Sequence, residues 1–209
     1  MKYPTYNLEK KLSRQGYQYI VGIDEVGRGA LAGPLVAVAT RIFNFKFLIS
    51  KQIQNPRLKI FKQVKDSKLL SENQREKIFE ELSEQVEWAV GMVSHAEIDQ
   101  MGIATANILA VRRAIENLKI KPDYLLIDQV YGFYHHLPHQ LIVKGDAKVL
   151  SISVASILAK VFRDRLMKEY HQKYPNYHFD RHKGYGTALH LRCLKDYGAC
   201  LIHRKSFKI

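Results

Sequence analysis

Short apolar runs recur along the first two thirds of the chain, and they alternate with longer stretches in which apolar residues are spaced for a helix. Residues 19–23 (YIVGI), 35–43 (LVAVATRIF), 86–93 (VEWAVGMV) and 124–127 (YLLI) are short and apolar, with many β-branched or aromatic side chains. These features favour strands, and residues 141–143 predict a shorter one. The pattern therefore predicts an α/β fold with five strands.

Two serine-led capping patterns indicate where helices begin. Ser71 with Gln74, and Ser94 with Glu97, have the spacing of a capping box, in which each side chain binds the other residue's backbone amide. Apolar residues follow both serines at helical spacing. The helices expected from these caps span residues 71–85 and 94–118.

The remaining segments complete a single-domain picture. Apolar residues recur at three- and four-residue steps through residues 152–170, which predicts an amphipathic helix. The lead-in before residue 19 is polar and basic, and residues 44–65 indicate a loop or a weak hairpin. No linker or repeat interrupts the chain. We expect one α/β domain over residues 1–209, with residues 171–209 as a helical C-terminal extension.

The charge of the chain points to a polyanionic partner. The sequence has 33 Lys and Arg against 20 Asp and Glu, which gives a formal net charge of +13. Nucleic acid or an acidic membrane would attract such a chain, although a merely solvated basic surface fits as well. With no apolar signal region and no membrane-length run, we expect a cytoplasmic protein without a membrane partner. Cys193 and Cys200 lack a zinc-site spacing and read as ordinary thiols.

Four acidic residues follow apolar runs, where charge needs partners. Asp24 and Glu25 follow the first run, Asp128 ends the fourth, and Asp146 follows the fifth. Each alone is explained by a salt bridge or a capped loop. Clustered at strand ends, they would repel one another unless divalent cations lay between them. Oxygen ligands favour Mg²⁺ or Mn²⁺, the ions commonly used in phosphodiester cleavage.

A glycine-rich turn follows the first two acids. Gly27, Arg28, Gly29 and Gly33 come close to a dinucleotide-binding fingerprint, but that fingerprint needs a helix next, and here a strand-like run follows. A second interpretation is that the glycines let backbone amides approach a nucleic acid, with Arg28 on a phosphate. A third is a tight turn with no binding role. The pattern alone leaves the last two open.

Ordered motifs along nearly the whole chain resemble those of the ribonuclease HII family. The motifs are GIDEVGRG (22–29), LAGP (31–34), DSKLL (66–70), LLID (125–128), KGDAK (144–148), SISVASILAKVFRDR (151–165), HKGYGT (182–187) and HRKSF (203–207). Their number and order make the resemblance far more specific than any single motif.

The resemblance implies a fold and a metal site. The fold would be a ribonuclease H-like mixed sheet flanked by helices, with a helical C-terminal extension. The catalytic and metal-binding carboxylates would be Asp24, Glu25, Asp128 and Asp146, holding two Mg²⁺ or Mn²⁺ ions during catalysis. The enzyme would be an endoribonuclease, and apart from the resemblance we expect it to be a monomer.

The resemblance also implies the substrate. Gly27, Arg28 and Gly29 would sense the ribose 2′-hydroxyl, the group that distinguishes RNA from DNA, and Tyr185 would pack on the sugar at the RNA–DNA junction. Substrates would be RNA–DNA hybrids and duplex DNA with embedded ribonucleotides, cut on the 5′ side to leave 3′-hydroxyl and 5′-phosphate ends. Candidate phosphate-binding residues are Lys68, Lys144, Lys148 and Lys183.

Some positions depart from the family or invite another interpretation. Gln129 follows the third acid where the family usually has Gly, and Ala30 stands where Pro is common. We expect Asp164 to form ion pairs on a helix surface. Three neighbouring histidines invite the interpretation of a metal site, but we expect them to belong to a polar loop: His135, His136 and His139.

Two alternatives stay open at this stage. The sister type, ribonuclease HIII, carries an additional N-terminal substrate-binding domain, for which the residues before the first strand are too few. A catalytically idle hybrid-binding protein would lack one or more of the four acids, and this chain has them all.

Overall fold

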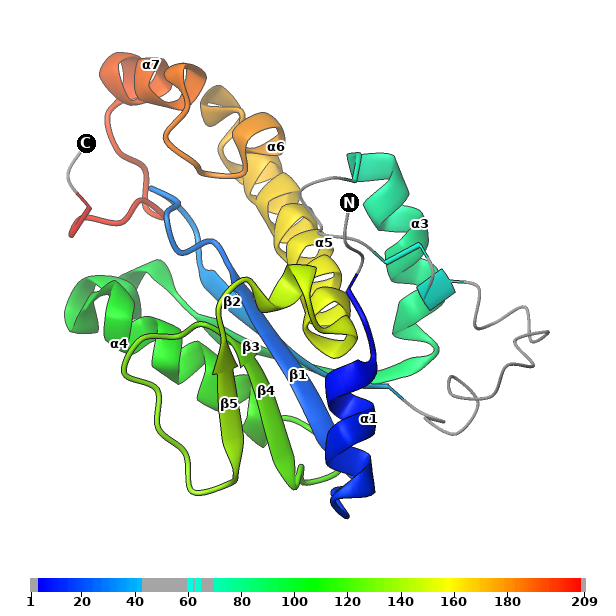
Figure 1. Ribbon diagram of the computed structural model, residues 1–209. Helices are drawn as coiled ribbons and strands as arrows, with labels where there is room; N and C mark the ends of the chain where they lie inside the picture. The colour runs from blue at the N-terminus through cyan, green and yellow to red at the C-terminus, as the bar shows by residue number, and fades with distance from the viewer. Residues whose placement is uncertain (1–3, 43–59, 62, 65–69, 208–209) are drawn as a thin grey trace.

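A mixed sheet, with five strands in the described part of the chain, forms the centre of the protein (Figure 1). The computed structural model describes residues 4–42, 60–61, 63–64 and 70–207. The strand order is β3-β2-β1-β4-β5, with β1–β2 and β2–β3 antiparallel and β1–β4 and β4–β5 parallel. The strands are β1 (Ile20–Val26), β2 (Leu35–Ile42), β3 (Val86–Val93), β4 (Tyr124–Asp128) and β5 (His139–Ile142).

All five strands are where the apolar runs predict them, with differences at their ends. β1 continues past residue 23 because its last residues pair with β2, up to Val26 opposite Val36. β5 begins two residues earlier than expected and ends at Ile142, because it pairs with β4 from His139 onward. The first acidic pair, Asp24 and Glu25, therefore lies inside a strand.

Helices cover both faces of the sheet (Figure 1). On one face α4 (His95–Glu116) packs on inward residues of β1 and β2 such as Ile23 and Ala37. On the other face α3 (Glu72–Ser83) and α5 (Leu150–Lys173) pack on the alternate residues, among them Val36 and Val38. This alternation is what a strand buried on both faces requires. The expected mixed sheet flanked by helices is confirmed.

Both capping boxes are confirmed. In α3 the Ser71 hydroxyl accepts from the Gln74 amide and the Gln74 side chain accepts from the Ser71 amide, and Ser94 and Glu97 do the same for α4. The sequence pattern did not predict the break in α4, where the backbone is non-helical at Gly102.

The helix α5 differs from the one-sided pattern expected for it. Its first ten residues, 150–159, are all buried, because the sheet, α3 and α1 enclose that half. An amphipathic stripe describes only the second half.

The helix α1 (Asn7–Arg14) was missed by the sequence pattern, which showed only a polar lead-in. Its Leu12 packs against Ile20 and Ile152. Its buried Glu9 accepts a hydrogen bond of 2.9 Å from the Ser151 amide. Because Val149, at the start of α5, provides no capping side chain, Glu9 serves that end of the helix instead.

The C-terminal segment forms a separate cluster at the far end of α5 (Figure 1). It contains η4 (Pro175–Tyr177), α6 (Phe179–His182) and α7 (Ala188–Tyr197), as expected for a helical extension. Isolated bridges join Ala30 to Tyr185 and Ala32 to His203. The extension is thus attached to the glycine-rich turn.

Three smaller expectations concern other regions. The expected loop or hairpin over residues 44–65 lies mostly outside the described residues. Cys193 and Cys200 are free thiols, as expected. In the described part of the chain, no helix combines the length and the apolar character needed to cross a membrane.

Candidate functional site

Two parallel strands bring three of the acids to one edge of the sheet. Asp24 and Glu25 are among the last three residues of β1, and Asp128 is the last residue of its parallel neighbour β4. Carboxyl ends of parallel strands share an edge, so these residues lie at the same end of the sheet. Asp146 reaches the site differently: β5 ends at Ile142, and Asp146 lies in the short helix η3 (Gly145–Ala147). Its predicted place at a strand end is wrong.

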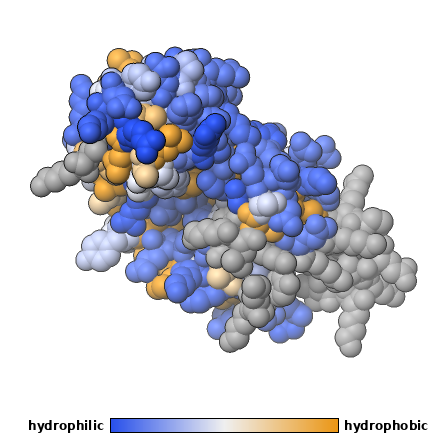
Figure 2. Space-filling view, turned by 90° about the horizontal axis from the view of Figure 1, so that it is seen from above, coloured by the Kyte–Doolittle hydropathy of each residue, from blue (hydrophilic) through white to orange (hydrophobic). Residues whose placement is uncertain are grey.

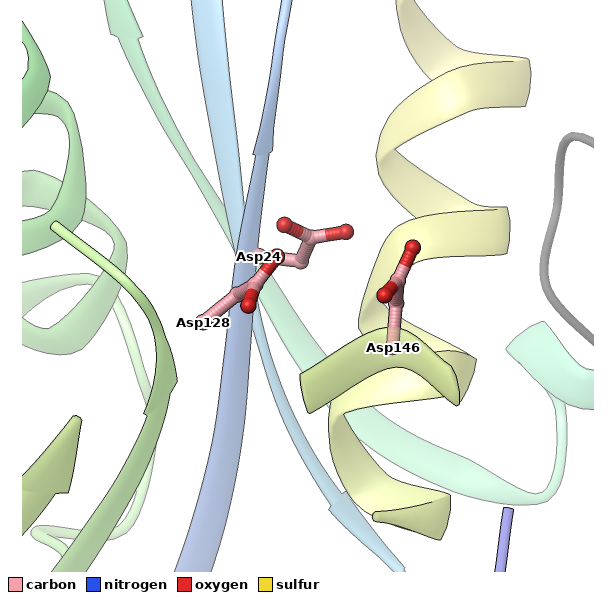
Figure 3. A group of neighbouring side chains, drawn as sticks. All are labelled: Asp24, Asp128 and Asp146. Atoms are coloured by element: carbon pink, nitrogen blue, oxygen red, sulfur yellow. The ribbon is translucent and has the colours of Figure 1, made fainter. Parts of the chain in front are cut away.

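Asp24, Asp128 and Asp146 converge on one point (Figure 3). Each offers one carboxylate oxygen, and these oxygens lie within 4.8 Å of one another. The Oδ1 atom of Asp128 accepts hydrogen bonds from the Gly145 amide (2.8 Å) and the Gln129 amide (3.0 Å). The first of these bonds ties the end of β4 to η3, which carries Asp146.

Gln129, which replaces the usual glycine, does not crowd this group. Its side chain is exposed, and it is not one of the residues that line the pocket. Its backbone amide orients the Asp128 carboxylate. The departure from the family pattern leaves the acidic group intact.

The side chains of Asp24 and Glu25 form hydrogen bonds on opposite faces of the sheet. Asp24 has a hydrogen bond with Ser156 of α5, whereas Glu25 has one with the buried Asn107 of α4. Burial raises the pKa of Asp24 well above its usual range, and the Glu25 and Asp128 carboxylates raise it further. Burial also raises the pKa of Glu25, together with the Asp128 carboxylate, to about 7.

This donor set fits divalent cations. The grouped ligands are carboxylate oxygens, and hard cations such as Mg²⁺ and Mn²⁺ prefer oxygen ligands. The raised pKa values of Asp24 and Glu25 show that negative charge gathered here lacks compensation from the protein alone. A bound cation would supply that compensation.

A pocket of about 470 Å³ joins the acids to the glycine-rich turn. Asp24, Glu25 and Asp128 line it. The residues expected to recognise the substrate line it as well: Gly27, Arg28, Gly29 and Tyr185. Motifs as far apart as Asp24 and Tyr185, 161 positions in the sequence, thus share one cavity. Asp146 does not line it, but one of its carboxylate oxygens lies within 4.8 Å of those of Asp24 and Asp128.

The four lysines expected to contact phosphates lie outside the lining of this pocket or outside the described residues. Lys144 and Lys148 are exposed on either side of Asp146, and the Lys148 ammonium donates to the Val143 carbonyl (2.6 Å). Lys183 is buried, with its ammonium bound to the Asp180 carbonyl and 3.5 Å from a Glu72 carboxylate oxygen. Lys68 lies outside the described residues.

Two cations of the pocket wall were missed by the sequence reasoning. Arg75 of α3 and Lys160 of α5 line the pocket. Lys160 lies 2.7 Å and Arg75 3.9 Å from the Asp164 carboxylate. Asp164 thus forms ion pairs, as expected. Its expected place on a helix surface is wrong, because α3 covers it and leaves it 3% exposed. The spacing of Ser156 and Lys160, one helical turn apart, was the available signal.

Two other interpretations of the sequence are decided by the structure. After the glycine turn the chain enters β2 and not a helix, so the dinucleotide-binding alternative is wrong. Of the three neighbouring histidines, His139 begins β5, and His135 stacks on His136 in the preceding loop. Within the described residues the metal-competent group found is the acidic one, without these histidines.

Comparisons with known proteins point in one direction. The family model described as Ribonuclease HII matches residues 21–209. The ribonuclease HII of Chlamydia caviae is 47% identical over 205 residues, which cover 95% of this chain and 88% of that protein. That of Caldicellulosiruptor saccharolyticus is 43% identical over 203 residues, covering 97% and 93%. The crystal structure of ribonuclease H2 from Pyrococcus horikoshii OT3 has a TM-score of 0.73 and 28% identity, covering 91% of this chain and 94% of that one.

Proposed function

The chain belongs to the ribonuclease HII family of metal-dependent endoribonucleases, and we propose that it cuts on the 5′ side of ribonucleotides embedded in duplex DNA and also degrades the RNA strand of RNA–DNA hybrids. The products would carry 3′-hydroxyl and 5′-phosphate ends. One observation supports this most: acids from a cluster of carboxylates that suits divalent cations share a pocket with the Gly-Arg-Gly turn and Tyr185.

For the chemistry, we propose that Asp24, Glu25, Asp128 and Asp146 together hold two Mg²⁺ or Mn²⁺ ions. Bound there, the ions would supply Lewis-acid activation of water and stabilisation of the leaving 3′-oxygen. The protein's own part is to hold the carboxylates in place. Asn107 and Ser156 orient Glu25 and Asp24, and two backbone amides orient Asp128.

For recognition, the turn and the tyrosine would act on the ribose. Gly27, Arg28 and Gly29 lie beside the acids in the pocket, where their backbone can approach a 2′-hydroxyl closely. Tyr185 lines the same pocket, and its ring would pack on the sugar at the RNA–DNA junction. A sugar that lacks the 2′-hydroxyl would lose the contact with the turn.

For the phosphates, the cations of the pocket wall are the first candidates. Arg28, Arg75 and Lys160 line the pocket with the acids, so a strand whose scissile phosphate reaches the acids passes close to them. Contacts farther along the duplex are proposed for the exposed Lys144 and Lys148 and for Lys68. Lys183, the last of the four, would have to exchange its contacts with Asp180 and Glu72 for a phosphate.

The remaining proposals concern the whole protein. We propose a cytoplasmic monomer that acts during DNA replication and repair. Residues 1–209 would form a single catalytic domain, within which residues 171–209 form an extension that contacts the substrate through Tyr185. The bridge between Tyr185 and Ala30 supports that role, because it joins the extension to the recognition turn.

The proposed catalysis is tested by Asp24→Asn, which keeps the shape of the side chain and removes its charge. We expect cleavage of a hybrid in Mg²⁺ to fall by several orders of magnitude while binding, measured by fluorescence anisotropy, persists. Full activity of the variant would contradict the assignment. A wild-type chain that binds hybrids in Mg²⁺ and Mn²⁺ without cleaving them would favour the idle hybrid-binding alternative.

A further inference from the structure

Two buried arginines lie against the glycine-rich turn of residues 27–34. Arg163 of α5 is fully buried and Arg204, which follows α7, is 1% exposed. In the described part of the chain, every hydrogen bond found for their guanidinium groups goes to a backbone carbonyl. Guanidinium has five N–H donors and no acceptor, so burying it requires several acceptors held at fixed positions. The turn provides most of them.

Arg204 holds the beginning and the end of the turn together. Its Nη2 donates to the Gly27 carbonyl (2.8 Å), its Nη1 to the Arg28 carbonyl (3.0 Å) and its Nε to the Gly33 carbonyl (3.0 Å). Its own amide donates to the Leu31 carbonyl (2.8 Å). One side chain thus fixes the direction of three peptide groups.

The direction of these carbonyls decides where the neighbouring amides point. In a trans peptide the C=O and the following N–H point in opposite directions. With the Gly27 and Arg28 carbonyls turned toward Arg204, the amides of Arg28 and Gly29 point away from it. Among the described residues, neither amide has a hydrogen-bond acceptor. Both residues line the pocket, and a side chain added at Gly29 would meet open space.

Arg163 connects the same turn to the tyrosine. It donates to the carbonyls of Ala32 (3.1 Å), Pro34 (2.9 Å) and Lys183 (2.8 Å). Its guanidinium carbon lies 5.4 Å from the centre of the Tyr185 ring. The turn and the tyrosine therefore rest on one shared side chain.

Gly27 shows how closely the turn is seated on Arg163. Its φ is +91°, and a Cβ added there would lie 2.3 Å from the Arg163 Nε. A side chain at this position would displace the guanidinium or lift the turn.

From this geometry we propose that Arg204, together with Arg163, is a positioning residue that presents the Arg28 and Gly29 amides to the ribose of the substrate. The inference rests on the proposed function, since it concerns how the same pocket selects a ribonucleotide. Arg204 touches no substrate and acts through the turn. Its loss therefore weakens discrimination between ribose and deoxyribose more than it weakens duplex binding.

The test compares Arg204→Lys and Arg204→Gln in the full-length chain. Lysine keeps the charge but cannot span three carbonyls with one ammonium. In an Asp24→Asn background, affinity is measured for a duplex with one ribonucleotide and for the all-DNA duplex of the same sequence. We expect the ratio of the two affinities to fall about tenfold while all-DNA binding stays the same. With Asp24 intact, kcat falls on the order of 10²-fold, as expected for a misplaced contact.

The matched control is Arg165→Lys, since Arg165 is on α5 but forms a half-exposed ion pair with Glu76. It should change neither ratio nor kcat. The inference would be overturned if the Arg204→Lys protein kept the wild-type ratio of affinities for the ribonucleotide duplex and the all-DNA duplex. It would also be overturned if both affinities fell equally and in proportion to a drop in the melting temperature. If Arg204→Gln does not fold, Arg204→Lys still decides. A wild-type chain that shows no preference for the ribonucleotide contradicts the proposed function itself, before any variant of Arg204 is made.

Discussion

Asp24 and Glu25 are neighbours in the sequence, yet each is held from a different side of the sheet. Ser156 of α5 binds one carboxylate and Asn107 of α4 binds the other. Alternation along a strand forces this separation. Both residues still serve one pocket because β1 ends directly after them, at Val26. The site therefore depends on helices from both layers of the fold.

Lys160 offers a test of the cationic wall at the scale of one residue. Replacing it with Met keeps the length of the side chain and removes a charge from the pocket. We expect KM for a hybrid to rise roughly tenfold, since a charge-assisted hydrogen bond contributes about 1.5 kcal/mol or more. The slope of log affinity against log salt should become shallower by about 0.7–0.9, the share of one phosphate.

Lys168→Met is the control for this prediction. Lys168 is also on α5 and pairs with Glu72, but it does not line the pocket. Its replacement should leave KM and the salt slope as they are. Equal effects of both variants would mean that general charge, and not the pocket wall, determines binding. The melting temperature of each variant separates a lost Asp164 contact from a lost substrate contact.

Site residues could be predicted from the sequence where a local pattern marks them, and not where their place depends on how helices pack. The acids after apolar runs and the glycine turn have local signals, and the structure brings them together. Lys160 has a weak local signal, its spacing of one helical turn from Ser156, and Arg75 has none, because the place of both in the pocket depends on how α3 packs on α5. Asp164 likewise looks like a surface residue until α3 covers it. Asp146 was expected at a strand end and reaches the site from η3.

At the scale of elements, β1 and α5 approach unusually closely, and this contact carries a prediction. A Cβ added at Gly22 would lie 2.3 Å from the carbonyl carbon of Ser151 and 2.5 Å from the Ile152 nitrogen. Both are backbone atoms of α5, so the helix itself would have to move. We expect Gly22→Ala to lower the free energy of unfolding by about 3 kcal/mol.

Denaturant unfolding measures this difference, with Gly29→Ala as the control for stability, because a Cβ there meets nothing. We expect unfolding of the Gly29→Ala protein to match the wild type. If Gly22→Ala were as stable as the wild type, the close packing of α5 on β1 would be wrong.

The elements themselves were largely predictable, and the exceptions have physical reasons. Apolar runs and capping boxes gave all five strands and the starts of α3 and α4. Helix α1 was missed because its stabilising contacts are distant: Leu12 packs on Ile152, and Glu9 binds the Ser151 amide. The one-sided pattern expected for α5 failed where several elements surround the helix.

At the scale of the whole molecule, the surface and the site have opposite charge. The chain carries a formal net charge of +13, while carboxylates gather at one edge of its sheet. Viewed from above, the molecule is mainly hydrophilic, with hydrophobic side chains in small groups (Figure 2). A basic surface would attract a duplex, and the acids are proposed to hold the ions that act on it. The ribonuclease H-like fold combines the two.

The C-terminal extension should make stability depend on pH. Burial lowers the pKa of His182 and of His203 to about 4, from an ordinary value of 6.5. Between these values the unfolded chain binds protons that the folded chain excludes. Stability is therefore complete above pH 6.5 and is lost as the pH falls toward 4, by up to about 1.4 kcal/mol per pH unit for each histidine.

The His203→Gln variant lacks one of these two titratable groups. Its free energy of unfolding should therefore fall less steeply than that of the wild type as the pH is lowered. His136→Gln, at an exposed position, is the control and should keep the wild-type slope. If the His203→Gln slope also equals that of the wild type, the buried histidines do not couple the fold to pH.

The acidic pocket beside the Gly-Arg-Gly turn is proposed to cut at ribonucleotides with the help of divalent cations. The most direct test of this proposal is incubation of the full-length protein with a DNA duplex that carries one ribonucleotide, in Mg²⁺, in Mn²⁺ and in excess EDTA. We predict a single cut on the 5′ side of the ribonucleotide, with 3′-hydroxyl and 5′-phosphate ends, in either metal and none in EDTA. Cleavage that persists in EDTA, or an intact duplex in both metals, would contradict the account.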